Sequence, residues 1–413
     1  KGRCARATIT LSPHPQTPRS GTEPMAAGGQ GGAPFLVGLI ADVQYSDCED
    51  GSDFSGKQRR YFRNALRITE AAVAHFNARG VGAVLQLGDI IDGRNAKAGT
   101  SGTALRAVLA ALEKLEVPER YDLIGNHELY NIRRADLPAS GLNCISPEGL
   151  TYRSVHLGQH WEAIILDPYE HALIGLPEDD AGYARAKELI AAANPNVLAS
   201  VAGGDWFNGL PVEKHRYVPY NGAASPTQLA WLEKALSAAE AQGRSVLVLT
   251  HIPLYVPATQ PKTVVWNCEE VLEVLHRHRD SVVAVLAGHD HDGGYAVDAA
   301  GIHHVTMNSP LTAEPGSDCF AVLECHEGGF ARFAACGRAC VESCTEGHGR
   351  AYPELILAKG AQNEPLGASA EKSATSEEAL AKMLAMGFPK DKASLALEAC
   401  GGNVEAATAM CCG

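Results

Sequence analysis

Residues 83–93 read Ala-Val-Leu-Gln-Leu-Gly-Asp-Ile-Ile-Asp-Gly, and this stretch decides the fold. Ala83–Leu87 is a short apolar run rich in branched residues, which predicts a buried strand that ends at Gly88. Asp89 follows directly, at the end of a strand where open α/β sheets bind their ligands. A carboxylate among apolar residues is costly to bury without a positive partner, so we expect Asp89 to face a cation.

Four more apolar runs end in a side chain that can bind a metal. The predicted strands are Phe35–Ala41, Asp122–Ile124, Ser245–Thr250 and Val282–Ala287. With Asp89, the polar residues that follow them form one candidate set: Asp42, Gln44, Asp89, Asn126, His251, His289 and His291. Carboxylates, amide oxygens and imidazoles without a thiolate suit two divalent ions, and they favour manganese, iron or zinc over copper. The amide oxygens favour manganese among these. His127 adjoins this set and can protonate a leaving oxygen or stabilise the charged transition state.

The segments between these strands predict an α/β fold. The spacing of apolar residues predicts helices over Gln58–Asn77 and Ala104–Leu115, and Trp161–Leu166 reads as a further strand. The first of these helices joins two strands into a βαβ unit. Leu176–Pro219 has no clear periodicity and carries several aromatic residues, so we expect an irregular functional lid or a surface insertion there.

Composition excludes several classes of function. The chain has 413 residues, of which 46% are hydrophobic, so it can bury a large core. A formal net charge of −13 argues against binding to nucleic acid or to an anionic membrane surface, and no apolar stretch is long enough to cross a bilayer. The 12 cysteines form no small-domain disulfide pattern, which indicates free thiols in a reducing compartment, the cytoplasm.

The ends of the chain differ from its middle. Residues 1–33 are rich in Gly, Pro, Ser and Thr, and we expect them to be disordered. Their early basic residues are compatible with an organellar transit peptide or with upstream sequence. We expect the main folded domain, which contains the strand-end residues, over residues 34–350 and a polar linker over residues 351–374. Residues 375–413 predict three short helices, the first capped by Thr375 and Glu378.

The strand-end motifs resemble those of the calcineurin-like metallophosphoesterases. These motifs are Asp-x-Gln at 42–44, Gly-Asp-Ile-Ile-Asp at 88–92, Gly-Asn-His-Glu at 125–128, His251, and Gly-His-Asp-His at 288–291. The resemblance implies a four-layer α/β/β/α sandwich and a pair of metal ions. It places one ion on Asp42, Gln44, Asp89 and His291, and the other on Asp89, Asn126, His251 and His289, with Asp89 bridging. It makes His127 the catalytic histidine.

Gln44 stands where most members of that superfamily have His. With Gly88–Asn95 and Gly288–Tyr295, it makes the chain similar to the manganese-dependent ADP-ribose/CDP-alcohol diphosphatases. That resemblance implies hydrolysis of the pyrophosphate of ADP-ribose, CDP-choline, CDP-glycerol and related conjugates to two phosphate monoesters. A phosphomonoesterase or protein phosphatase is the alternative within the superfamily. In protein phosphatases an Arg usually follows the Gly-Asp-x-x-Asp block, whereas here Gly93 intervenes.

The C-terminal residues resemble a ubiquitin-associated domain. The resemblance depends on two stretches. One is Met386-Gly387-Phe388, which would form the loop that touches ubiquitin, and the other is residues 401–407, Gly-Gly-Asn-Val-Glu-Ala-Ala. The resemblance implies a small three-helix bundle and ubiquitin as a partner. A ubiquitin-binding adaptor with an inert hydrolase core is therefore a third hypothesis.

Overall fold

The structure of the protein is a computed structural model. It describes residues 32–53, 56–117, 119–199, 205–339, 341–342, 351–360, 372–386, 388–390, 392–393, 397 and 408. The predicted disordered segment at residues 1–33 lies outside the described residues, except for its last two positions. Within the described part of the chain, no helix combines the length and the apolar character needed to cross a membrane.

The first sheet is built around β1 and β4 and has the strand order β18-β15-β14-β1-β4-β5. Its strands are β1 (Phe35–Ile40), β4 (Ala83–Gln86), β5 (Arg120–Asp122), β14 (Cys319–Cys325), β15 (Phe330–Gly337) and β18 (Glu354–Ala358). β1 runs parallel to β4 and antiparallel to β14, with Leu39 opposite both Leu85 and Ala321. The parallel half brings the ends of β1, β4 and β5 to one edge.

The second sheet has the strand order β12-β13-β11-β10-β7-β6. Its strands are β6 (Arg153–Leu157), β7 (Trp161–Ile165), β10 (Ser245–Leu249), β11 (Val282–Ala287), β12 (Gly294–Val297) and β13 (His303–Thr306). β7, β10, β11 and β13 are mutually parallel, and Val248 lies opposite Ile164 and Val285. The chain beyond β10 and β11 carries the candidate histidines.

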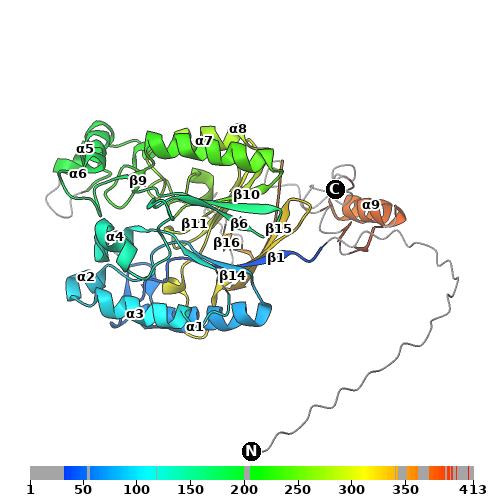
Figure 1. The fold of residues 1–413 in the computed structure, drawn as a ribbon, viewed down its shortest axis with the longest axis horizontal. Helices are drawn as coiled ribbons and strands as arrows, with labels where there is room; N and C mark the ends of the chain where they lie inside the picture. Colours follow the sequence, from blue (N-terminus) through cyan, green and yellow to red (C-terminus); the bar gives the residue numbers. More distant parts are fainter. Residues whose placement is uncertain are drawn as a thin grey trace, which may run out of the picture. The chain divides into compact units, whose positions relative to one another are not determined.

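Helices cover the outer face of each sheet. The helices are α1 (Phe62–Arg79), α2 (Arg94–Ala98), α3 (Ser101–Leu112), α4 (Asn126–Asn131), α5 (Ala181–Ala193), α6 (Pro195–Ala199), α7 (Pro226–Ala241), α8 (Cys268–Arg277) and α9 (Lys372–Ala385). Figure 1 shows α1 and α3 on one side of the stacked sheets, and α7 and α8 on the other. This arrangement confirms the predicted α/β/β/α sandwich. Ser225 caps α7 as its sequence suggests, because its side chain accepts a hydrogen bond from the Gln228 N–H.

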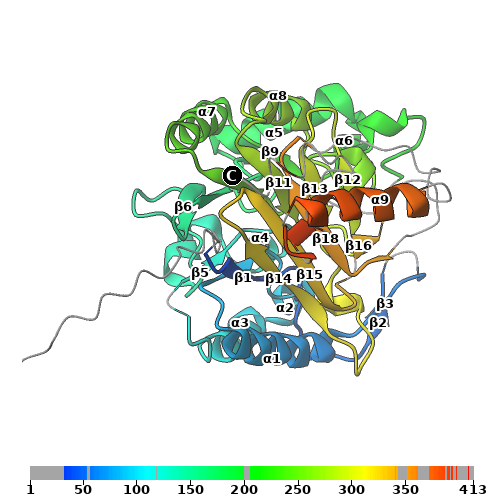
Figure 2. The same cartoon turned by 90° about the vertical axis from the view of Figure 1, so that its right-hand side faces the viewer.

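Short elements complete the description. They are β2 (Gly51–Ser52), β3 (Arg59–Arg60), β8 (His171–Ala172), β9 (Gly222–Ala223), β16 (Val341–Glu342) and β17 (Ala351–Tyr352), with 3-10 turns at Arg134–Ala139, Val212–Lys214, Val256–Ala258 and Pro310–Thr312. Figure 2 shows the sheets from the side of β15 and β18, with the helices α1 and α3 at one end of the view and α7 and α8 at the other.

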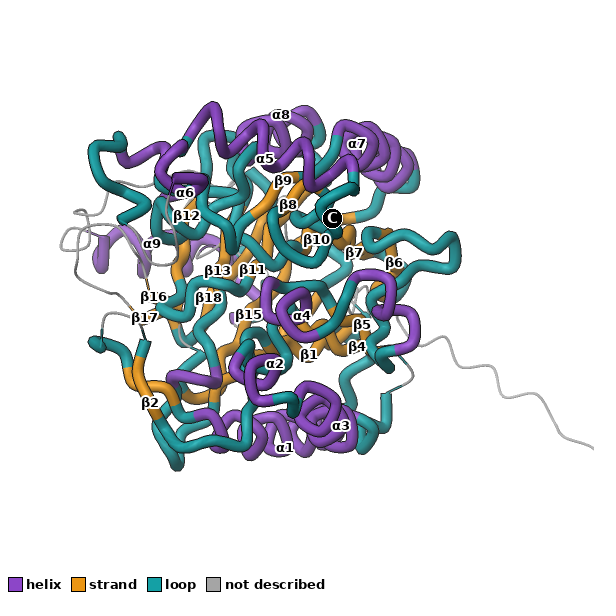
Figure 3. The backbone as a smooth tube through the Cα atoms, turned by 90° about the vertical axis from the view of Figure 1, so that its left-hand side faces the viewer, coloured by secondary structure: helices purple, strands orange, loops and turns teal. Residues whose placement is uncertain are grey.

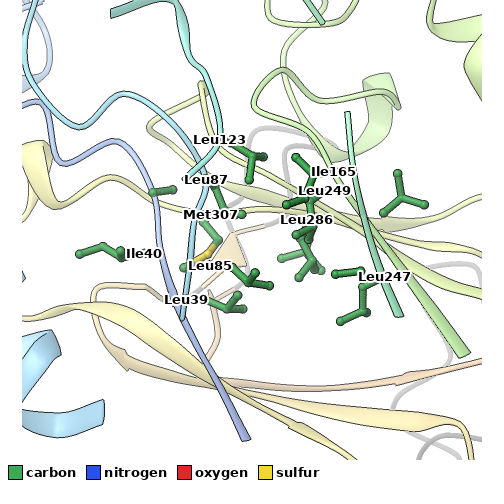
Figure 4. Close-up of a cluster of buried hydrophobic side chains, with 14 of the residues drawn as sticks. Leu39, Ile40, Leu85, Leu87, Leu123, Ile165, Leu247, Leu249, Leu286 and Met307 are labelled. Atoms are coloured by element: carbon green, nitrogen blue, oxygen red, sulfur yellow. The ribbon is translucent and has the colours of Figure 1, made fainter. Parts of the chain in front are cut away.

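The core lies between the sheets. Leu39 and Leu85 of the first sheet and Leu247, Leu249 and Leu286 of the second are completely buried, and Figure 4 shows them in one cluster. Burying each such side chain contributes roughly 1.5–3 kcal/mol to the free energy of folding. The apolar runs that predicted buried strands are therefore the residues that hold the two sheets together.

Three sequence-based boundaries are wrong. The helix predicted from Gln58 begins at Phe62, because Arg59 and Arg60 pair with Ser52 and Gly51. The stretch predicted as irregular at residues 176–219 contains α5 and α6, and Asp180 caps α5 by accepting the Gly182 N–H at 2.7 Å. The strand predicted at residues 122–124 lies at residues 120–122.

The predicted linker at residues 351–374 also needs correction. Residues 354–358 form β18, which pairs with β15 through partners such as Leu355 and Phe333, so the first sheet extends past residue 350. In the C-terminal segment, α9 begins at Lys372, before the predicted cap at Thr375. Ala379, Met383, Ala393 and Leu397 form a small buried cluster of their own. The predicted third helix falls almost wholly outside the described residues.

Candidate metal centre

The strand ends bring the candidate side chains together. The ligand atoms of Asp89, His251 and His289 all lie within 4.8 Å of one another. Asp89 Oδ2 lies 3.4 Å from His251 Nε2, and His251 Nε2 lies 3.2 Å from His289 Nδ1. Asn126 Oδ1 lies 3.3 Å from His251 Nε2. Residues that follow β4, β10 and β11 thus meet the first residue of α4 at one point; Figure 3 faces the side of the molecule on which α4 lies.

A second group meets on the other side of Asp89. Gln44 Nε2 lies 3.0 Å from Asp89 Oδ2 and 2.9 Å from His291 Nε2. His291 Nε2 in turn lies 3.6 Å from Asp42 Oδ1. All seven candidate residues therefore belong to one continuous cluster, with Asp89 at its centre.

The backbone is strained where these side chains leave it. Asp42, Gln44, Asp89 and His289 have φ values of 49°, 43°, 61° and 70°, and no other non-glycine residue in the described part of the chain has a positive φ. Each such residue costs roughly 1–3 kcal/mol and persists only where its surroundings enforce it. Here Asp42 N–H donates to Gly88 O at 3.0 Å, which joins the ends of β1 and β4. Strain confined to this cluster marks it as the functional site.

Two glycines make room for the carboxylates. A Cβ on Gly125 would lie 2.1 Å from Asp89 Oδ1, and a Cβ on Gly288 would lie 2.3 Å from Asp42 Oδ2. Neither distance is compatible with a side chain. Glycine is thus required at the ends of β5 and β11 so that the neighbouring loops can approach the acidic groups.

Glu128 fixes the loop that carries Asp89. Its buried carboxylate accepts hydrogen bonds from the backbone N–H groups of Asp89, Ile90 and Gly125 at 2.7, 2.6 and 2.7 Å. Burial raises the pKa of Glu128 to about 7, and the charge of Asp89 acts in the same direction. One carboxylate therefore connects the end of β4 to the start of α4, without itself pointing at the cluster of ligand atoms.

His127 is oriented by the loop after Asp89. Its Nδ1 accepts a hydrogen bond from the Gly93 N–H at 2.7 Å, which leaves the proton of the neutral ring on Nε2. Nε2 lies 3.9 Å from Asp89 Oδ2, at the edge of the candidate metal centre. Asp92 Oδ2 lies 3.5 Å from Nδ1 and has no hydrogen-bond partner, so it can stabilise a positive charge on the ring.

The cluster has the properties of a cation site. Gln44 Oε1 is buried and has no hydrogen-bond partner, while Nε2 of the same amide faces Asp89 and His291, so a half-turn of the amide would offer a neutral oxygen to an ion there. Burial alone would raise the pKa of Asp89, but the nearby His251, His127 and His289 hold it below its ordinary value. Burial, with His251 close by, lowers the pKa of His289 well below its usual range and favours the neutral ring that a metal needs. The residues present therefore fit divalent ions.

A polar pocket opens beside His291. It has a volume of about 230 Å³ and is lined by Lys57, Gln58, Arg59, Tyr61, His291, Asp292, Asn308, Thr312, Glu314 and Arg338. Three of these residues are basic, so the pocket offers positive charge next to the acidic centre. Apart from His291, the sequence analysis gives these residues no role, because they come from separate segments of the chain around residues 57–61, 292, 308–314 and 338.

The fold and the centre define a class of protein. The family model described as calcineurin-like phosphoesterase matches residues 35–293, which is more than half of the chain. This match places the chain among the calcineurin-like phosphoesterases. A second model, described as UBA/TS-N domain, matches residues 376–410 and confirms the predicted C-terminal domain type.

Proteins of similar sequence identify the family within this class. The chain is 34% identical over 325 residues to a manganese-dependent ADP-ribose/CDP-alcohol diphosphatase of Danio rerio, across 75% of this chain and 97% of that protein. Proteins of the same name from Arabidopsis thaliana and Homo sapiens are each 33% identical, across 71% and 70% of this chain and 91% and 86% of theirs. The chain belongs to the family of manganese-dependent ADP-ribose/CDP-alcohol diphosphatases.

A solved structure supports this assignment. The crystal structure of a dimetal phosphatase from Danio rerio superimposes on the chain with a TM-score of 0.69 at 30% identity. The superposition covers 79% of this chain and all of that one. The predicted architecture of the hydrolase domain is thereby confirmed a second time.

Proposed function

We propose that the chain hydrolyses the pyrophosphate of ADP-ribose, CDP-choline, CDP-glycerol and related nucleoside diphosphate conjugates to two phosphate monoesters. The observation that carries this proposal is the convergence of Asp89, His251 and His289 at the strand ends, with their ligand atoms within 4.8 Å of one another. The family relatives named for this activity support the choice of substrate. They do not favour a phosphomonoesterase, a protein phosphatase or an inert adaptor.

Two divalent ions, preferably manganese, complete the site in this proposal. Asp42, Gln44, Asp89 and His291 hold one ion, and Asp89, Asn126, His251 and His289 hold the other; iron or zinc also suits this donor set. A pair of such ions activates water near neutral pH and neutralises charge on a phosphoryl group. Asp89 lies between the two groups of ligands, which supports its role as the shared ligand.

His127 is the proposed general acid. Because Gly93 N–H occupies Nδ1, the N–H that His127 can direct at the leaving oxygen sits on Nε2, the nitrogen nearer Asp89. Proton transfer of this kind typically contributes 10²–10⁴-fold to a rate.

The basic pocket beside His291 suits the charged part of the substrate. Lys57, Arg59 and Arg338 line it, and each carries a positive charge at neutral pH. A pyrophosphate carries negative charge on both phosphoryl groups, so a basic recess next to the ions can bind the phosphoryl group that the metal centre does not hold.

The test combines substrates, metals and variants. The purified chain should release AMP and ribose phosphate from ADP-ribose, and CMP and choline phosphate from CDP-choline, faster with manganese than with magnesium. Asp89→Asn should abolish turnover, and His127→Asn should lower kcat by about 10²–10⁴-fold with little change in KM. Unchanged turnover in Asp89→Asn, or preferential hydrolysis of a phosphopeptide, would refute the proposal.

The C-terminal domain is a proposed ubiquitin reader. Met386 is 58% exposed, whereas Phe388 packs partly against the cluster around Met383; Gly387, the middle residue of the predicted loop, lies outside the described residues. An exposed apolar side chain beside a packed aromatic suits a weak protein contact. Titration of the full chain with ubiquitin tests this, with Met386→Glu as the variant that should lose binding.

We also propose that the protein acts in the cytoplasm. Cys48, Cys144, Cys268, Cys325 and Cys336 are free thiols in the described part of the chain. Unpaired cysteines in this number are typical of a reducing compartment. Fluorescence microscopy of the tagged chain, with and without residues 1–24, distinguishes the cytoplasm from an organelle.

A further inference from the structure

Asn221 contacts a candidate metal ligand from outside the cluster. It comes directly before β9, at the end of the insertion that contains α5 and α6, and its side chain is completely buried. Asn221 Oδ1 lies 2.8 Å from His289 Nε2, the ring nitrogen that faces away from His251. No sequence motif marks this residue, and neither the family signature nor the proposed reaction uses it.

The orientation of the Asn221 amide is determined by its neighbours. Its Nδ2 donates hydrogen bonds to the carbonyl oxygens of Arg216 and Lys262, at 2.9 and 2.8 Å. Because both of these partners are acceptors, the nitrogen must lie on that side and the oxygen must face His289. His289 Nε2 must then carry a hydrogen, since it donates to that oxygen.

A backbone carbonyl fixes the tautomer of the neighbouring His251. Its Nδ1 lies 2.7 Å from Leu87 O, so Nδ1 carries the proton of the neutral ring and Nε2 keeps a lone pair. Asn221 leaves the lone pair of His289 on Nδ1. These two nitrogens lie 3.2 Å apart. When both rings are neutral, their two lone pairs repel each other at this distance, and a proton or a metal ion between them removes the repulsion.

We propose that Asn221 is a positioning residue that fixes the tautomer and ring direction of His289 and so sets the affinity of one metal ion. This inference rests on the proposed function. This role extends the candidate metal centre to the insertion, because Asn221 also joins the loops of Arg216 and Lys262 through its hydrogen bonds. A hydrogen-bond partner of this kind is typically worth 10–100-fold in metal affinity.

Asn194 provides a matched control. It is also a completely buried asparagine, and its Nδ2 donates to Tyr217 O at 2.9 Å, so it tethers the same insertion. No hydrogen bond joins Asn194 to a candidate ligand among the described contacts. Asn194→Ala therefore removes a tether of the insertion without removing the acceptor of His289.

The experiment measures manganese binding to the metal-free full chain, by electron paramagnetic resonance of the unbound ion. We expect two bound ions in the wild type and a 10–100-fold weaker affinity for one of them in Asn221→Ala, whereas Asn194→Ala should match the wild type. Asn221→Asp and Asn221→Ala both lose the hydrogen bonds to the Arg216 and Lys262 carbonyl oxygens, but Asn221→Asp keeps an oxygen beside Nε2 and should bind manganese more tightly than Asn221→Ala. Raising the manganese concentration should restore kcat in Asn221→Ala, with KM for ADP-ribose unchanged.

Three results would overturn the inference: wild-type affinity in Asn221→Ala, an equal loss in Asn194→Ala, or an equal loss in Asn221→Asp. Circular dichroism shows whether each variant folds, and Asn221→Ser carries the same comparison if the alanine variant does not. A wild-type chain that binds no manganese would contradict the proposed function instead, so the two failures are distinguishable.

Discussion

Replacing Glu128 by Gln tests how the site is held in place. The Glu128 carboxylate accepts three buried backbone N–H groups, two on Oε2 and one on Oε1. A glutamine amide has one oxygen, so its NH₂ group must face at least one of these donors. The substitution loses one charge-assisted hydrogen bond, worth about 1.5–3 kcal/mol, and leaves a buried N–H without a partner. We expect the free energy of unfolding to fall by roughly 3 kcal/mol.

The same change should weaken the centre, because two of the three N–H groups belong to Asp89 and Ile90. Urea denaturation measures the stability, and turnover of ADP-ribose against manganese concentration measures the site. Glu162→Gln is the control, since Glu162 is a buried carboxylate of β7 that pairs with Ser154 and Arg244, away from the centre. Wild-type manganese dependence in Glu128→Gln, or the same shift in Glu162→Gln, would refute the reasoning.

Three further predictions follow from individual contacts. Gln44→Glu places a carboxylate beside Asp89, so the metal-free chain should lose roughly 1–3 kcal/mol of stability. Manganese should raise the Tm of this variant more than it raises the Tm of the wild type, and calorimetry measures both effects. Gly288→Ala would put a Cβ 2.3 Å from Asp42 Oδ2, and we expect at least a tenfold lower kcat/KM in a chain whose circular dichroism is unchanged. Burial lowers the pKa of His303 to about 4, so the folded state binds fewer protons than the unfolded state between pH 6.5 and 4. Stability should therefore fall by up to about 3 kcal/mol as pH falls through that window, and His303→Gln should flatten this slope in urea titrations at several pH values.

The strand-end motifs predicted which side chains the fold brings together, because each motif depends on local sequence. A short apolar run followed by Asp89 or His251 implies both a buried strand and a polar residue at its end. The positions of Glu128 and Asp92 were visible in the same motifs, but their roles were not. Those roles depend on which backbone N–H groups lie nearby, and that follows only from the arrangement of the loops.

The parts that sequence did not predict depend on contacts between distant segments. Asn221 lies in an insertion without a motif, and only the folded chain brings it to His289, 68 positions further along the sequence. β18 is a five-residue strand after a weakly patterned stretch, so its pairing with β15 gave no periodic signal. α5 was missed because its alanine-rich sequence has a weak apolar stripe and buries few side chains.

Anomalous diffraction at the manganese absorption edge, from crystals of the chain grown with manganese, tests the central claim most directly. The account predicts two peaks about 3.5–4 Å apart, with the carboxylate of Asp89 in contact with both. A single peak, or a pair of peaks that does not share Asp89, would contradict it.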